Sequence, residues 1–188
     1  MDNLTLEFDK LASIDPKIKY GFVKEILKTG KENPGLLYEH YDYWVKLLDD
    51  KNNIIKWAAI DIIGYLSSVD KENKTEKKIP ALFKLLHGGR LITSAHAIFA
   101  LGLIAQNKEK QKAKIIKELL SVSHDKFETT ECKNIITGKV LDVLKLFPTD
   151  IQKNETAIDF IKKAVKNRRN ATKKRAEQLL KKIGKEKG

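Results

Sequence analysis

A tryptophan, an aspartate and a tyrosine stand four residues apart in the sequence, as Trp57, Asp61 and Tyr65. Residues at i, i+4 and i+8 share one face of an α-helix. Aromatic rings on such a face can anchor a partner's apolar side chains or stack on nucleic-acid bases. Asp61 suits a core position poorly, because an unpaired buried carboxylate is costly. The three are therefore candidate binding residues, although Trp57 could instead fill the core between neighbouring helices.

The other residues capable of catalysis or metal binding are isolated in the sequence. The four histidines lie far apart and lack metal-ligand spacing: His40, His87, His96 and His124. We interpret His96 as a packed or groove-edge histidine. The single cysteine, Cys132, excludes an internal disulfide and is interpreted as a small structural residue. No phosphate-binding glycine loop, Gly-x-Ser-x-Gly or His-Glu-x-x-His motif occurs. We expect no catalytic residue, no metal and no cofactor.

Composition favours a folded, helical protein. Of the 188 residues 41% are hydrophobic, and only four are proline and ten glycine, which predicts long regular elements. No apolar stretch approaches the roughly 20 residues that cross a bilayer. Residues 1–10 contain three acids and one lysine, unlike a secretory signal. With one cysteine, a reducing compartment is expected, and we predict a cytoplasmic protein without a membrane partner.

The strongest sequence pattern is an internal repeat. Residues 55–66 align with 93–104, so that Gly64 and Gly102 coincide, and weaker copies follow at 138–147 and 173–183. Amphipathic patterns predict a first helix before each copy, over 36–48, 77–86, 112–123 and 156–166. Turns are expected at Gly30, 33–35, 49–53, 88–89, 147–148 and 167–170. Further helices at 4–13 and 16–28 would cap the array. Such spacing is typical of HEAT and armadillo repeats.

Residues 47–66 resemble a HEAT repeat. The residues on typical family positions are Ile55, Lys56, Ala58, Ala59, Ile63, Gly64 and Leu66. The copy at 85–104 keeps two leucines, Ala97, Leu101 and Gly102, but replaces the acidic turn by residues 87–90. The resemblance implies an all-α superhelix, a short HEAT-like solenoid of about four to five helix pairs. It implies a single domain over 1–188, with capping helices in 1–30 and repeats over 36–184. It says little about activity.

The resemblance also indicates a binding surface, because second helices line the concave face of HEAT-like arrays. Small residues such as Gly64 and Gly102 should allow close helix packing, which would justify their cost of about 1 kcal/mol each in a helix. The expected ridge changes from aromatic to basic along the array. Its candidate binding residues are Trp57, Asp61, Tyr65, Phe99, Leu103 and Asp142. Phe99, like Trp57, could instead belong to the core between repeats.

The net charge of +12 is unevenly distributed. Residues 1–70 carry 9 basic and 12 acidic residues, a net of −3, whereas 71–188 carry 28 and 13, a net of +15. Candidate phosphate contacts are Lys139, Lys173, Lys174, Arg175 and Lys182. Only four of the 37 basic residues are arginine, which favours a solvated surface over specific phosphate recognition. Nucleic-acid binding would require one continuous positive stripe.

We therefore expect a non-enzymatic scaffold or adaptor that binds a protein or peptide on its concave face. The alternative is nucleic-acid binding through the basic C-terminal half. That alternative includes an activity like that of the DNA alkylation-repair glycosylases, which this chain resembles in expected fold. Their site has a tryptophan and an aspartate four residues apart, as Trp57 and Asp61 are. The surrounding tryptophans of that family are absent, and Trp44 falls on an expected outer helix. The oligomeric state stays open.

Overall fold

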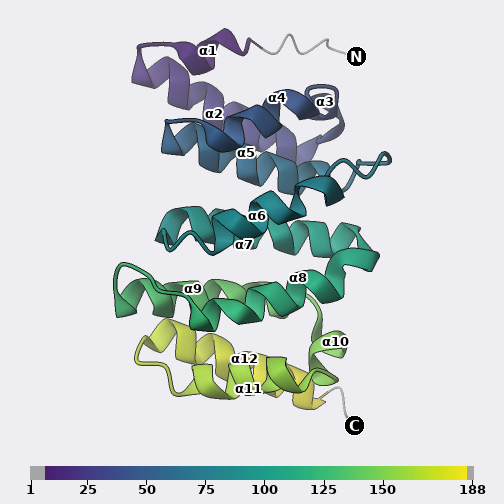
Figure 1. Ribbon diagram of the computed structural model, residues 1–188, viewed down its shortest axis with the longest axis vertical. Coiled ribbons are helices and arrows are strands. Elements are labelled where there is room, and N and C mark those ends of the chain that lie inside the picture. The colour runs from purple at the N-terminus through teal and green to yellow at the C-terminus, as the bar shows by residue number, and fades with distance from the viewer. Residues whose placement is uncertain (1–6, 186–188) are drawn as a thin grey trace.

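The computed structural model describes residues 7–185, and within that range every regular element is a helix (Figure 1). Three of these elements are short 3₁₀ turns, at Leu47–Asp49, Glu76–Lys78 and Val122–His124. The α-helices of the described residues are α1 (Asp9–Ala12), α2 (Pro16–Glu32), α3 (Gly35–Tyr38), α4 (Tyr41–Lys46), α5 (Asn53–Leu66), α6 (Ile79–Leu86), α7 (Leu91–Asn107), α8 (Glu109–Ser121), α9 (Thr130–Leu144), α10 (Pro148–Gln152), α11 (Glu155–Val165) and α12 (Asn170–Lys185).

The helices stack as successive pairs from the N-terminal to the C-terminal end of the molecule (Figure 1). The second helices pack on one another in chain order: α2, α5, α7, α9 and α12. The first helices pack against the second helices beside them. Helix α6 packs on α7 and α11 on α12, while α8 contacts both α7 and α9. The expected all-α solenoid is confirmed, and the described residues form five pairs when α1 and α2 are counted as one. Figure 1 shows the pairs as parallel layers of a stack.

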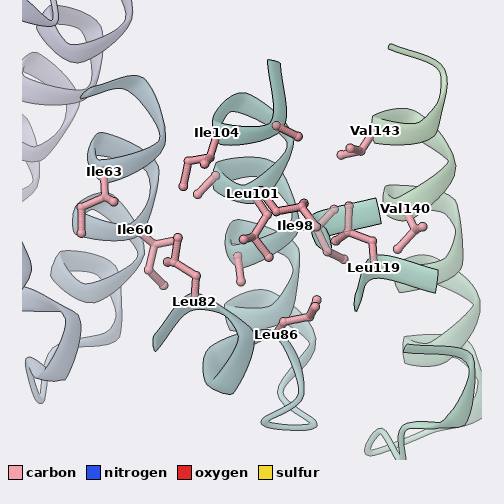
Figure 2. Packing of buried hydrophobic residues seen from close by; sticks show 14 of the residues in the cluster. Ile60, Ile63, Leu82, Leu86, Ile98, Leu101, Ile104, Leu119, Val140 and Val143 are labelled. Atoms are coloured by element: carbon pink, nitrogen blue, oxygen red, sulfur yellow. The ribbon is translucent and has the colours of Figure 1, made fainter. Parts of the chain in front are cut away.

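The apolar core runs unbroken from pair to pair. Figure 2 shows how α5, α6, α7, α8 and α9 contribute to it through Ile60, Ile63, Leu82, Leu86, Ile98, Leu101, Ile104, Leu119, Val140 and Val143. All ten side chains are buried. One helix pair cannot cover its own apolar face, so each pair depends on its neighbours for burial. The rigid second-helix layer that results positions the candidate site.

Glycines mark the closest contacts between second helices. A Cβ on Gly64 of α5 would lie 2.7 Å from the Cα atom of Ala100 on α7. A Cβ on Gly102 of α7 would lie 2.9 Å from a methyl group of Val143 on α9. These short distances confirm that both glycines allow close helix packing. The closer packing compensates for the free energy that glycine costs within a helix.

The predicted first helix at 36–48 is broken in the structure. It consists of α3, α4 and a 3₁₀ turn, with His40 at φ −100° and ψ 22° between α3 and α4. The indole Nε1 of Trp44 donates to the carbonyl oxygen of Leu37 at 3.2 Å, which helps to satisfy this acceptor at the break. The buried Trp44 and Tyr41 therefore pack where a continuous helix was expected.

Other details of the helices differ from the prediction. Helix α2 continues through Gly30 to Glu32, since Gly30 packs against Tyr65 and Leu37 instead of ending the helix. Helix α9 begins at Thr130, ahead of the repeat copy at 138–147, and the hydroxyl of Thr129 caps it by accepting from the N–H of Cys132 at 3.1 Å. The short α10, which starts at Pro148, was not predicted. The predicted helix at 4–13 lies partly outside the described residues.

Within residues 7–185, no helix has the length and apolar character needed to cross a bilayer.

Candidate binding surface on the second helices

Trp57 lies half-buried between α5 and α7. Its ring stacks on the imidazole of His96, with 5.7 Å between centroids and 7° between planes. Its indole Nε1 donates to the hydroxyl of Thr93 at 3.0 Å. One face and the polar edge of the tryptophan are therefore occupied by α7, so that Trp57 is a contact between helix pairs. Trp57 also lines a groove, so its position has features of both interpretations offered by the sequence.

Asp61 pairs with His96, a partner that the sequence analysis did not assign to it. Its Oδ1 atom lies 2.8 Å from Nδ1 of His96, and its side chain is 13% exposed. Burial raises the pKa of Asp61, and the hydrogen bond and charge of His96 act in the opposite direction. A neutral imidazole that donates from Nδ1 to this carboxylate presents Nε2 as an acceptor. The pair explains how a carboxylate is tolerated on this ridge.

A hollow of about 350 Å³ opens beside this pair, between α5, α7 and α9. Its lining includes Asp61, Tyr65, His96, Phe99, Lys139 and Asp142. The rings of Tyr65 and Phe99 meet edge to face at 5.5 Å, and Phe99 is 40% exposed. Burial raises the pKa of Tyr65, and the nearby charge of Asp61 adds to the effect. We call this feature the face hollow. It offers aromatic walls together with groups of both charges.

The face hollow contains four of the six predicted binding residues but not the other two. Leu103 is half-buried beside the contact of Gly64 with α7. Trp57 lines a different groove. His96 is the residue that sequence reasoning undervalued. The sequence does contain an indication of the pairing: His96 follows Asp61 by almost one repeat length, which places the two residues at similar positions on neighbouring second helices.

The candidate phosphate contacts are partly engaged within the protein. Arg175 Nε lies 2.9 Å from Asp142, and Lys182 Nζ donates to the carbonyl oxygen of Lys145 at 3.1 Å. Lys173 lies 3.9 Å from Glu177, whereas Lys139 and Lys174 are exposed.

The basic side chains are also not confined to the second helices. The first helices α8 and α11 carry exposed lysines as well: Lys110, Lys114, Lys117, Lys162 and Lys163. The positive charge therefore covers both layers, in contrast to the single stripe that nucleic-acid binding requires.

Two histidines connect neighbouring helix pairs. Besides His96, His87 at the end of α6 lies 2.6 Å from Asp125 and 3.0 Å from Glu118 of α8. Among residues 7–185, no group of three or more histidine, cysteine or acidic side chains is arranged to hold a metal ion. Cys132 lies in the first turn of α9, half-buried and next to Thr129.

Stacked helix pairs with one continuous core define this chain as a helical-repeat solenoid. No family model and no curated protein matches its sequence. Solved structures do match its fold. An engineered protein is 16% identical with a TM-score of 0.63, over 97% of this chain and 80% of that chain. A designed armadillo repeat protein is 20% identical with a TM-score of 0.58, over 93% and 79% of the two chains.

A further engineered protein is 17% identical with a TM-score of 0.60, and the match covers 97% of this chain but 47% of that chain. At such identities the similarity concerns the fold alone. All three are engineered or designed proteins, and the armadillo example is a repeat protein by its description.

Proposed function

We propose that this chain is a HEAT-like scaffold or adaptor that binds another protein or a peptide on the face formed by its second helices. Residues 1–188 would act as one array, with 1–30 as its N-terminal cap, in a reducing compartment such as the cytoplasm. The observation that supports the proposal is the face hollow, which combines the exposed ring of Phe99 with Tyr65 and the Asp61–His96 pair.

Rigid helices lower the entropic cost of presenting such a surface. Aromatic side chains in desolvated positions are frequent energetic centres of protein interfaces. The carboxylate of Asp61, the imidazole of His96 and the ammonium group of Lys139 lie within the same lining. A partner side chain with an apolar stem and a polar end would fit this combination.

The proposal can be tested with a random peptide library displayed on phage and selected on the folded chain. Enriched peptides are then titrated against the wild type, Phe99→Ser and the control Ile14→Ser, which alters an apolar residue that is 98% exposed near the N-terminus. Loss of the Phe99 anchor should weaken binding about tenfold or more, and the control should bind like the wild type. Circular dichroism checks that each variant is folded. The proposal is refuted if every enriched peptide binds Phe99→Ser as tightly as the wild type.

The nucleic-acid alternative stays a prediction, and the structure adds no support for it. The ring of Trp57 is stacked on His96, and the carboxylate of Asp61 is paired. Release of alkylated bases from DNA, lost in Asp61→Asn, remains the measurement that would establish the glycosylase-like activity.

A further inference from the structure

A second and larger depression lies along the edge of the stack where first helices end and second helices begin. It has a volume of about 1000 Å³ and extends from Leu48, before α5, past α6 and the start of α7 to Cys132 on α9. It shares no lining residue with the face hollow. The stacked rings of Trp57 and His96 stand between the two, since Trp57 lines one and His96 the other. We call this depression the edge groove.

The floor of the edge groove is apolar. Leu48 is buried, and Val45, Leu85 and Leu91 are half-buried along it. The side chain of Ile92 is 48% exposed at the groove. This apolar surface lies beside Trp57, and tryptophan is among the residue types most enriched in the energetic centres of interfaces. An occupant that buries it must bring apolar side chains of its own.

The rim of the edge groove is positively charged. The rim contains four positively charged and two negatively charged side chains. The positive ones are Lys56, Lys78, Lys84 and Arg90, and the negative ones are Asp49 and Glu128. Arg90 lies 4.0 Å from Glu128. No carboxylate of the described residues lies within ion-pair distance of the three lysines on this rim. The first turn of α7, which has no side-chain cap, adds the positive end of its dipole to the same place.

We propose that the edge groove binds an acidic segment of a partner protein that also carries apolar side chains. The carboxylates of such a segment would neutralise the lysines on the rim, and its apolar side chains would cover the floor. This interface is separate from the one proposed for the second-helix face and does not depend on it. The edge groove runs past the starts of α5, α7 and α9, so the segment would contact three helix pairs.

Other occupants match the groove less well. The phosphates of a nucleic acid could neutralise the rim as carboxylates would, but they bring no apolar side chains to cover the floor. A small inorganic anion would likewise leave the floor exposed to water. An acidic segment with apolar side chains is the occupant that uses both the rim and the floor.

The test compares two charge reversals that change the net charge equally. Lys56→Glu/Lys84→Glu alters the rim, and Lys162→Glu/Lys163→Glu alters exposed positions of α11. Phage-displayed random peptides are selected on the wild-type chain, depleted on the rim variant, and then titrated against all three proteins by fluorescence anisotropy. Enriched peptides should combine acidic with leucine-like or aromatic residues. The rim variant should weaken their binding about tenfold or more and the α11 variant by less than about threefold.

Tryptophan fluorescence gives an independent readout of where the peptides bind. Trp44 is completely buried, whereas Trp57 lines the edge groove, so binding there should shift the emission of Trp57. Phe99→Ser should leave this binding unchanged, which separates the outcome from that of the second-helix face.

Several results would overturn the proposal. These are no enrichment, enrichment of basic or purely polar peptides, equal losses in the two charge-reversal variants, or no shift in Trp57 emission. Tighter binding of a single-stranded oligonucleotide than of the selected peptides, lost in the rim variant, would assign the groove to nucleic acid. A dimer of the wild type that the rim variant dissociates would assign it to a second copy of the chain.

Discussion

The pairing of Asp61 with His96 shows how a polar group is placed on an otherwise apolar ridge. The carboxylate is only 13% exposed, and burial raises its pKa even though His96 hydrogen-bonds to it. A raised pKa means that folding binds protons, so the free energy of unfolding falls as the pH rises from the ordinary value of 3.8 through the raised one. Ionised Asp61 therefore costs stability at neutral pH.

Asp61→Asn should remove this cost. An amide oxygen still accepts the hydrogen bond from His96 and carries no charge that burial opposes. The variant should resemble the wild type near pH 4 and become relatively more stable towards pH 7. Urea unfolding at both values measures the difference. A variant less stable than the wild type by more than about 1 kcal/mol at pH 7 would mean that the ionised pair stabilises the fold.

The sequence predicted the face on which Asp61 lies but not its partner. A spacing of four residues is enough to place Trp57, Asp61 and Tyr65 on one side of a helix. The partner depends on how α7 is positioned along α5, and no local pattern encodes that register. The pairing of Arg175 with Asp142, between α12 and α9, was missed for the same reason.

At the scale of helices, the contact between α5 and α7 depends on the missing side chain of Gly64. Gly64→Ala improves helix propensity by about 1 kcal/mol, but its Cβ would lie 2.7 Å from the Cα atom of Ala100, which is backbone and cannot rotate away. Moving the two helices apart should cost more free energy than the higher helix propensity provides. The free energy of unfolding should therefore fall by about 1–3 kcal/mol. Thermal and urea unfolding of the variant measure this loss.

The matched control is Gly21→Ala within α2. Beyond the neighbouring backbone of α2 itself, no atom lies within 4 Å of the position that its Cβ would occupy, so only the gain in propensity remains. It should stabilise the protein by about 0.5–1 kcal/mol. Equal effects of the two substitutions would contradict the role assigned to Gly64.

Helix boundaries were predictable where local chemistry decides them. Asp15 and Asn52 cap α2 and α5, and the predicted starts of these helices agree with the structure to within about two residues. The break between α3 and α4 was not predictable, since it depends on the tertiary packing of Trp44 and Tyr41. The repeat alignment covers only the later turns of α9, because its first turns have few apolar residues.

At the scale of the whole molecule, the repeat spacing predicted the stack and the order of its layers. It did not predict the edge groove, because that depression forms between the ends of helices that lie far apart in the sequence. The second-helix face and the edge groove lie on opposite sides of the Trp57–His96 contact. If both proposed surfaces bind, their partners would not compete for one site.

Asp70 links more distant parts of the stack than any other acidic residue that the structure describes. Its carboxylate accepts from the hydroxyl of Tyr38 at 2.6 Å, from the N–H of Thr75 at 2.8 Å and from the hydroxyl of Thr75. Lys108, just before α8, lies 3.5 Å away. Burial alone would raise the pKa of Asp70, but the hydrogen bonds from Thr75, Tyr38 and the N–H of Lys74 outweigh it and lower the pKa to about 2.

Because this pKa is depressed, Asp70 stabilises the folded chain above its ordinary value of 3.8, and that stability is lost as the pH falls towards about 2. Asp70→Asn should lower the free energy of unfolding by about 2 kcal/mol at pH 7, since an amide cannot accept all of these bonds. It should also flatten the dependence of stability on pH between about 4 and 2. Urea unfolding over that range measures both effects. A variant that keeps the wild-type slope would show that other carboxylates govern acid unfolding, and that the turn after α5 does not couple the helix pairs it touches.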